Sequence, residues 1–338
     1  MKAHARTLEL LGAHDPEKLE SLRRYFLDEE QIRSRWYECD DVDENWDDHG
    51  IYQLGEDSPH GLGITQRHHF YADRARKIFE EIYRCSPTPD HLIHVTCTGY
   101  LSPSPGQKFF SGKESSPEFT HAYHMGCYAS IPAVRLAESL VKGRGLEVDV
   151  VHTEMCSLHL DPEDVGPEHM VVQSLFADGH MKYRLSREPS GTSLRLLATH
   201  EEIVPESERD MTWVPGPYGM KMTLSKHVPL KIAGKLSAFL EKLFRKARKG
   251  EELFQRAIFA VHPGGPKIVS GVQELLGLSE EQVKMSRKVL FERGNMSSAT
   301  LPHVWDEVLR ENPEKGTPVV ALAFGPGLTI IGAIFEVS

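Results

Sequence analysis

The chain has 338 residues, a formal net charge of −10 and a pI near 6.0, and 40% of its residues are hydrophobic. This length favours two linked halves with ample material for a large core. The acidic balance excludes a general surface for nucleic acid. No apolar run approaches the roughly 18–20 residues of a membrane span, and the N-terminus lacks the apolar core and cleavage site of a secretory signal.

Five cysteines occur in the chain, an odd number with no CxxC pair. This pattern favours neither a disulfide framework nor a zinc site, and it fits a reduced, cytoplasmic compartment. No metal or cofactor is expected. In such a compartment a single cysteine can serve as a nucleophile.

The first half alternates helix and strand. An amphipathic helix is predicted over 68–84, a buried strand over 91–98 and a Pro-, Ser- and Gly-rich loop over 101–117. Gly126 and Cys127 then precede a helix over 129–142 with one apolar face, and a strand follows over 146–153. The alternation predicts an α/β class.

The second half repeats this layout. A helix over 231–249 is followed by a strand over 257–261 that runs into His262 and two glycines, and then by a helix over 266–276. Gly294 and Asn295 open a further short helix, and a strand over 319–324 enters Gly325-Pro326-Gly327. Each half thus has a strand ending in a Gly-containing loop and a Gly-X pair opening a helix, which indicates an internal duplication.

Cys127 is the first candidate for chemistry. At a helix N-terminus, unpaired N–H groups and the positive end of the dipole favour thiolate over thiol, and a thiolate can accept an acyl group from a thioester. The alternative is a buried structural cysteine, because free cysteine is among the most buried residue types.

Two further residues could act with it. His262 stands at the end of an apolar strand, where α/β sheets bind ligands, although the chain has 18 histidines and a core role stays open. Asn295 could cap a helix, or it could donate its amide to an enolate or oxyanion. Gly325 to Gly327 could be a plain turn, or could let backbone approach a substrate and present an N–H.

Four segments, in this order, closely resemble the chalcone synthase or type III polyketide synthase family: GCYASIPAVRLAESL, AVHPGGPKIVSGVQELLGL, VLFERGNMSSATLPHVWDEVL and AFGPGLT. The resemblance covers most of residues 90–338, and residues 96–99 and 176–179 are further landmarks. It implies the five-layered αβαβα thiolase fold, made of two pseudo-duplicated halves that we place at 1–205 and 206–338, and it implies a homodimer.

The resemblance also implies roles. Cys127, His262 and Asn295 match the family's catalytic triad, in which the cysteine carries the acyl chain while histidine and asparagine stabilise the enolate of the second substrate. The N–H of Cys127, with one near Gly325 or Gly327, would hold the oxyanion. Substrate-binding positions would be Thr98, Cys156, His159, Phe176 and Met222.

Several positions depart from the family. The lysine that grips coenzyme A phosphates in chalcone synthases is replaced by Glu29, while Arg33 and Arg35 remain. Met222 replaces a gatekeeper phenylalanine and predicts a roomier channel. Cys156 and His159 stand where chalcone synthases have pocket threonines, so the cavity is lined differently.

A basic helix could bind the carrier of the acyl chain in place of a coenzyme A site. Its cations predict a dock for an acidic acyl carrier protein, although an ordinary surface helix with a cation-rich end explains them too. These cations are Lys242, Arg245, Lys246, Arg248 and Lys249.

The resemblance and the departures from it leave three alternative functions open. The first is a ketosynthase that joins two β-ketoacyl chains, at least one carrier-bound, and closes an α-pyrone, as do similar stand-alone enzymes of myxobacterial antibiotic pathways. The second is a type III polyketide synthase that extends a starter with malonyl-CoA to alkylpyrones or resorcinols. The third is a non-catalytic thiolase-fold partner protein.

Overall fold

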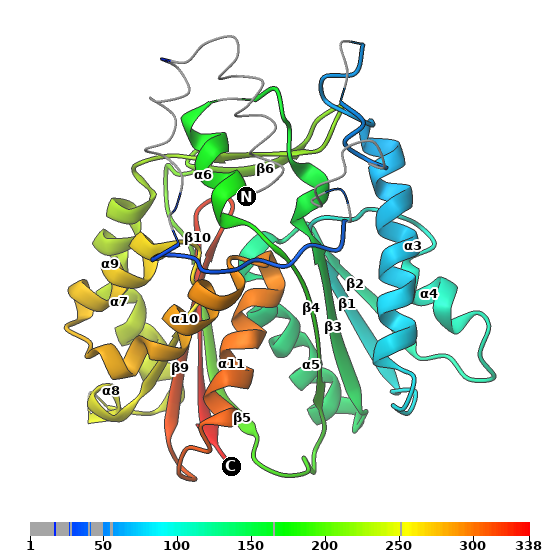
Figure 1. Cartoon of the computed structure of the whole chain (residues 1–338). Helices are drawn as coiled ribbons and strands as arrows, with labels where there is room; N and C mark the ends of the chain where they lie inside the picture. Colours follow the sequence, from blue (N-terminus) through cyan, green and yellow to red (C-terminus); the bar gives the residue numbers. More distant parts are fainter. Residues whose placement is uncertain are drawn as a thin grey trace.

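The computed structural model shows an α/β protein built around two four-stranded sheets (Figure 1). It describes residues 17, 27, 29–39, 41, 50–54, 57–164, 166–250 and 252–338. Within these ranges, no helix is long and apolar enough to cross a membrane.

The first sheet has the strand order β2-β1-β3-β4. Strands β2, β1 and β3 run parallel, and β4 is antiparallel to β3. Both β1 and β3 are buried along their whole length, as expected for central strands covered on both faces. The bounds are β1 His91–Thr96, β2 Glu118–Tyr123, β3 Val148–Met155 and β4 Asp178–Leu185.

The second sheet has the order β5-β10-β9-β8. Strands β8 and β9 run parallel, and β10 is antiparallel to both of its neighbours. The bounds are β5 Leu194–Ile203, β8 Ile258–Val261, β9 Pro318–Gly325 and β10 Thr329–Val337. A separate hairpin joins β6 (Met211–Pro215) and β7 (Met220–Leu224).

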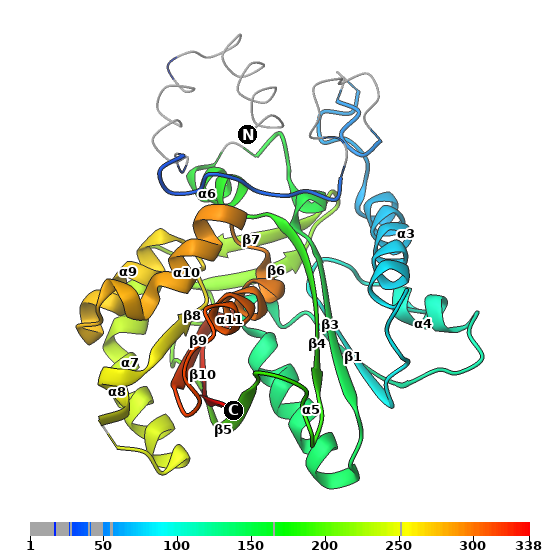
Figure 2. The ribbon, with the colours of Figure 1, turned by 60° about the horizontal axis from the view of Figure 1, so that its bottom comes forward.

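Two helices, α5 (Ser130–Arg144) and α11 (Thr300–Arg310), lie between the sheets (Figure 2). Ala137 of α5 packs on the first sheet, while Ile131 of the same helix packs on the second. Trp305 of α11 packs into the core of the second sheet and meets the ring of Tyr183 on β4 edge-on. These buried faces hold the two halves together.

Further helices cover the outer faces, which gives five layers in the order helix, sheet, helix, sheet, helix. Phe79 of α3 (Ile64–Ile82) packs on β1 and β3. Phe239 of α7 (Val228–Ala247) packs on β8 and β10. The remaining helices are α4 Pro105–Phe110, α6 Pro167–Leu175, α8 Glu252–Arg256, α9 Pro266–Leu276 and α10 Glu280–Arg293.

The duplication expected from the sequence is visible in the topology. Strands β1, β3 and β4 are arranged as β8, β9 and β10 are: two parallel strands followed by an antiparallel one. A central helix precedes the second strand of each set, α5 in one half and α11 in the other. Cys127 and Asn295 therefore stand at equivalent places, just before these helices.

One expected loop contains a helix, and the strand pairing bears on the expected division of the chain. The loop expected over 101–117 contains α4, because Ser104 and Gln107 form a capping box that starts a short helix there. The division of the chain expected at residue 205 stays a prediction. Strand β5, which precedes that point, pairs with β10 of the second half.

Candidate active site

Cys127 lies in a three-residue 3-10 turn, Gly126–Tyr128, directly ahead of α5. Gly126 has φ +77°, and a Cβ there would come within 2.9 Å of Pro326 Cδ. Only glycine suits both the backbone conformation and this close approach. The Gly325-Pro326-Gly327 loop therefore packs against the turn that carries the cysteine.

Burial controls the thiol. It raises the pKa of Cys127 to about 11, although nearby Ser297 and Asn295 lower it in part. The expectation that the helix N-terminus would favour the thiolate is therefore wrong for the resting protein. The thiol sits in a short turn before the α-helix proper, where loss of solvent outweighs the backbone N–H groups.

Asn295 uses the two ends of its amide differently. Its Oδ1 accepts hydrogen bonds from the Ser297 N–H at 2.9 Å and from Thr300 Oγ1 at 3.2 Å. Its amide group also acts on the thiol as a hydrogen-bond partner that lowers the pKa of Cys127. Asn295 is not the N-cap of either following helix, since the caps are Met296 and Ala299. Its role as a donor to an enolate or oxyanion stays a prediction.

His262 ends β8, where its N–H donates to Leu322 O at 2.7 Å. The side chain is 1% exposed, and burial lowers its pKa to about 3, so the imidazole is neutral. Neither ring nitrogen has a hydrogen-bond partner among the described residues. Leaving two buried polar atoms unpaired costs free energy, which a bound carbonyl oxygen or thiol proton would recover.

One apolar cluster joins the cysteine to three of the expected substrate-binding residues. Cys127 packs with Cys156, Phe176 and Met222. The cluster also holds residues that sequence reasoning missed, from three other parts of the chain: Leu27, Ile32, Val172, Leu175 and Leu290. No local motif marks them, because only the fold brings these segments together.

Thr98 and His159 are bonded to each other outside this cluster. The His159 Nε2–H donates to Thr98 O at 2.8 Å, and His159 Nδ1 accepts from the Met220 N–H at 3.1 Å. Burial lowers the pKa of His159 to about 3, so the ring stays neutral and both nitrogens are used. A substrate-binding role for these two residues stays a prediction.

The buried carboxyl of Glu154 bonds with several residues near the site, and sequence reasoning missed it. It accepts hydrogen bonds from Thr98 Oγ1 at 2.7 Å, from the Cys97 N–H at 3.0 Å and from Ser298 Oγ. Burial raises the pKa of Glu154. Ser297 Oγ lies 2.9 Å from Cys97 Sγ and 3.8 Å from Cys127 Sγ. Glu154 thereby connects β1, β3 and the Asn295 turn.

In the Gly325-Pro326-Gly327 loop, one of the expected oxyanion donors is already hydrogen-bonded. Gly327, at φ +82°, already donates its N–H to Met211 O at 3.2 Å, so it is not a free donor in this structure. At Gly325 a Cβ would lie 2.0 Å from Tyr128 Cδ1, so glycine is required there for packing. The oxyanion roles of Gly325 and of the Cys127 N–H stay predictions.

The basic helix is α7, and its apolar face is buried against the second sheet. The helix ends at Ala247, before the expected residue 249, so Arg248 and Lys249 lie beyond it. Three of the five predicted docking cations are engaged: Lys242 with Glu202, Lys246 with Thr199 O, and Lys249 with Glu336. These contacts agree with an ordinary surface helix. Docking of a carrier protein there stays a prediction.

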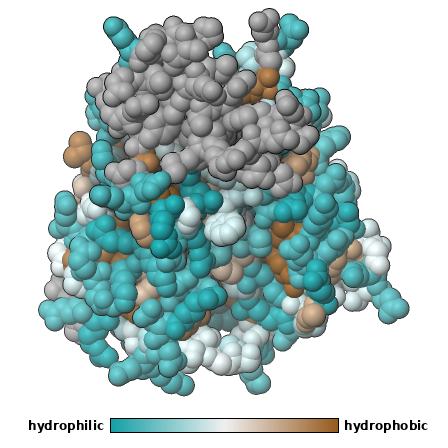
Figure 3. Space-filling view, viewed as in Figure 1, coloured by the Kyte–Doolittle hydropathy of each residue, from teal (hydrophilic) through white to brown (hydrophobic). Residues whose placement is uncertain are grey.

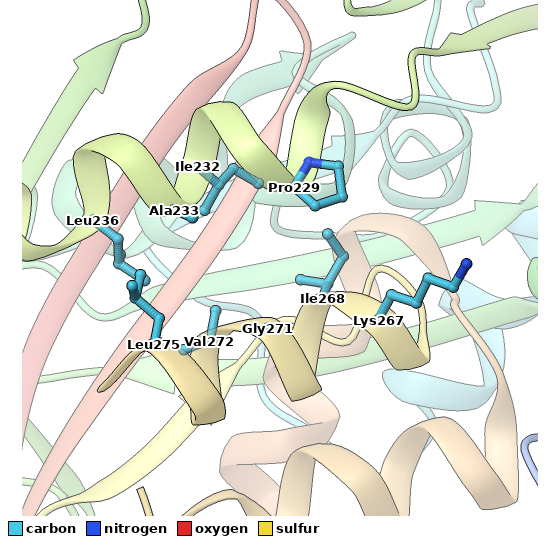
Figure 4. Close-up of a pocket in the computed structure, with 9 residues that line it drawn as sticks. All are labelled: Pro229, Ile232, Ala233, Leu236, Lys267, Ile268, Gly271, Val272 and Leu275. Carbon is cyan, nitrogen blue, oxygen red and sulfur yellow. The ribbon is translucent and has the colours of Figure 1, made fainter. Parts of the chain in front are cut away.

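The surface also carries a shallow apolar groove between α7 and α9 (Figure 4). Its lining shares no residue with the Cys127 cluster. Elsewhere the described part of the face in Figure 3 is mostly hydrophilic, with scattered apolar residues. The lining residues are Pro229, Ile232, Ala233, Leu236, Lys267, Ile268, Gly271, Val272 and Leu275.

Comparison with known proteins shows which proteins the chain is similar to. Residues 195–337 match the C-terminal domain of chalcone and stilbene synthases. Type III polyketide synthase C of Arabidopsis thaliana is 29% identical over 258 residues, which cover 73% of this chain and 67% of that protein. The chain is thus similar to chalcone synthase-like type III polyketide synthases. The two curated relatives that it matches are both named as polyketide synthases.

Two further matches support this similarity. A probable polyketide synthase 1 of Dictyostelium discoideum is 32% identical over 255 residues, 73% of this chain but only 8% of that much longer protein. The C-terminal type III polyketide synthase domain of Steely1, a type I/III hybrid from Dictyostelium, superposes with a TM-score of 0.81 at 26% identity, covering 95% of this chain and 90% of that one. The predicted five-layered thiolase fold is thus confirmed.

Proposed function

We propose that the protein is a ketosynthase that forms carbon–carbon bonds between acyl thioesters through an acyl-Cys127 intermediate. The observation that carries this proposal is the buried, neutral and unpartnered imidazole of His262. With the oriented amide of Asn295 it provides neutral donors of the kind that an enolate oxygen needs. The apolar cluster around Cys127 suits the acyl chain.

In the first step, the Cys127 sulfur attacks the carbonyl of the starter thioester and forms a tetrahedral oxyanion. The thiol is protonated at rest, so the attacking species is the thiolate that forms when its proton leaves to solvent, and the N–H of neutral His262 is proposed to donate to the developing oxyanion. Collapse of the intermediate breaks the bond to the carrier sulfur. That sulfur takes up a proton from solvent and leaves as a thiol, and the acyl group remains on Cys127.

In the second step, His262 and the Asn295 amide bind the thioester carbonyl of the second substrate. Loss of a proton or of carbon dioxide from its α-carbon gives the enolate, whose negative oxygen both residues stabilise. The enolate carbon attacks the acyl-Cys127 carbonyl, and the cysteine sulfur leaves. Attack of an enol oxygen on the remaining thioester would then close an α-pyrone and release the second carrier thiol.

For the donor, we propose that at least one β-ketoacyl chain arrives on an acyl carrier protein. Glu29 lies exposed in a turn where a coenzyme A-binding relative has lysine, and acid beside a polyphosphate is unfavourable. Exposed Arg33 favours the second candidate, extension with malonyl-CoA. We further propose a homodimer and a reducing, cytoplasmic location, in which the cysteines stay free.

Intact-protein mass spectrometry after exposure to paired acyl-CoA and acyl-carrier substrates tests the proposal. We expect one acyl group to be added from the carrier-bound chain and none to the Cys127→Ala variant. Exposed Cys85→Ala is the matched control and keeps the acyl group. Acylation without carbon dioxide release from malonyl-CoA would favour the chain-joining reaction. Efficient turnover of malonyl-CoA without acylation from a carrier would favour the second candidate, and no mass gain at all would support a non-catalytic partner.

The rate of acylation should rise with pH. Because burial raises the pKa of Cys127 to about 11, the thiolate fraction grows about tenfold per pH unit below that value. His262, with a pKa of about 3, adds no second titration above pH 5. Rapid-quench mass spectrometry should therefore give a slope near one, on a logarithmic scale, between about pH 6.5 and 9. A plateau below pH 8 would instead indicate a preformed thiolate–imidazolium pair.

A further inference from the structure

Residues 29–39 form a segment that joins distant parts of the site. In Figures 1 and 2 this segment, in dark blue, runs across the molecule from α10 towards α3. The Arg33 N–H donates to Phe291 O of α10 at 2.7 Å, and Trp36 O accepts from the Asp178 N–H of β4 at 2.9 Å. The segment is thus fixed at two points on either side of Arg35.

Arg35 reaches from this segment to the end of α6. Its Nη1 donates to Gln173 O at 2.5 Å and to Phe176 O at 3.0 Å. A cation suits the last carbonyls of a helix, which are unpaired and carry the negative end of the dipole. Tyr37 adds a longer hydrogen bond to Phe176 O, at 3.4 Å.

The same stretch of α6 and β4 holds the catalytic amide. The Asn295 N–H donates to Leu175 O at 3.0 Å, and the Ala177 N–H donates to Asn295 O at 2.8 Å. Phe176 sits between these two bonds, and its ring belongs to the Cys127 cluster. The backbone that Arg35 grips is therefore the backbone that sets the place of Asn295.

Arg35 also packs beside Asn295, on the other side of the backbone pairing between Phe176 and Asn295. A Cβ on Gly294, which has φ +70°, would lie 2.8 Å from Arg35 Cγ. The arginine stem thus packs directly against the residue before Asn295. A shorter or more flexible side chain would leave both Gly294 and the Phe176 carbonyl without support.

We infer that Arg35 is a positioning residue that holds Phe176 and Asn295 in register with Cys127, and not a ligand for donor phosphates. This inference rests on the proposed ketosynthase function. Arg33, two residues earlier, pairs with Glu292 at 3.7 Å and lies over the Phe291 ring, but its side chain is 61% exposed and so stays accessible to a donor. The two arginines that the family resemblance left together as phosphate contacts thus have different roles.

The test compares Arg35→Ala and Arg35→Lys with Arg33→Ala and Arg209→Ala. For Arg35→Ala, kcat of condensation should fall about a hundredfold, because small displacements of reacting groups have effects of that size. KM should change less than about threefold, and Arg35→Lys should recover part of the loss. The loss should be the same with coenzyme A thioesters and with pantetheine thioesters, which lack the nucleotide phosphates.

Arg209→Ala, at a side chain that is 94% exposed, is the neutral control and should leave kcat and KM unchanged. Arg33→Ala, at a residue that can meet the donor, should act on KM for coenzyme A thioesters and not on the Ala177 and Asn295 amides. In Arg35→Ala, a loss confined to coenzyme A substrates, or an unchanged kcat, would overturn the inference. Hydrogen exchange separates this result from a failure of the proposed function, because it needs no turnover. The Ala177 and Asn295 amides should exchange faster in Arg35→Ala than in wild type or Arg33→Ala. If Arg35→Ala does not fold, Arg35→Lys and Tyr37→Phe give the same comparison, and unchanged kcat and amide exchange in both would overturn it.

Discussion

Replacing Asn295 with aspartate is expected to lower the rate of carbon–carbon bond formation about a thousandfold, the size of effect seen when an oxyanion donor is lost. Aspartate keeps the acceptor that the Ser297 N–H and Thr300 use, so the turn should stay intact. It replaces the donating end of the amide with a negative oxygen. That oxygen repels the developing enolate instead of stabilising it.

Acylation should suffer less than condensation in this variant. A carboxylate near Cys127 raises the pKa of the thiol further and slows the first step, but this step does not depend on an enolate. The two steps can be measured separately, by forming the acyl-enzyme from a saturated acyl donor and then adding the second thioester. Asn312→Asp, on the surface, is the matched control and should change neither step. Condensation within tenfold of wild type in Asn295→Asp would remove Asn295 from the proposed mechanism.

The sequence was sufficient to place the three candidate catalytic residues in the fold, because they stand at element boundaries. Cys127 and Asn295 each follow a glycine and precede a central helix, and His262 ends a buried strand. Glycine, strand and helix patterns are local, so these positions could be predicted. Their equivalence in the two halves follows from the repeated strand order.

What the sequence missed depends on contacts between distant segments. Glu154 lies inside a fully buried strand that also holds Asp149, and nothing local shows that it will accept bonds from the end of β1 and from the Asn295 turn. Ile32 and Arg35 lie in a stretch without regular structure, and only the fold places them beside Phe176. The state of the Cys127 thiol was mistaken for the same reason: helix ends are visible in a sequence, whereas burial is a property of the whole fold.

The protein is also expected to unfold in mild acid, because it buries neutral histidines. An unfolded histidine titrates near pH 6.5. Between that pH and about 4 the unfolded chain binds up to five more protons at these side chains than the native state does. Stability therefore falls as the pH falls through this window. Burial lowers the pKa to about 3 or 4 at His94, His152, His159, His262 and His303.

Two buried carboxyls act in the opposite direction. Burial raises the pKa of Asp178 to about 7 and also raises that of Glu154, so the native state takes up these protons first as the pH falls. On unfolding, the five histidines gain protons and the two carboxyls lose them, so the chain takes up about three protons in all. That number corresponds to ~4 kcal/mol of stability lost per pH unit. About 10 kcal/mol is then lost between about pH 6.5 and 4, so the protein would unfold above pH 4 if its stability lies in the lower half of the typical range of ~5–15 kcal/mol.

Urea unfolding followed by circular dichroism from pH 8 to 4.5 would measure this loss. In His152→Gln the slope should shrink by about one proton, or ~1.4 kcal/mol per pH unit, because glutamine does not titrate. Glutamine can still bond with Ser298 Oγ and the Tyr183 hydroxyl, the present partners of His152 at 3.0 and 3.2 Å. Exposed His69→Gln should leave the slope as it is. A wild-type free energy of unfolding that stays constant down to pH 4.5 would mean that the buried histidines, His262 among them, gain protons in the native state. The neutral imidazole on which the proposed mechanism depends would then be lost as well.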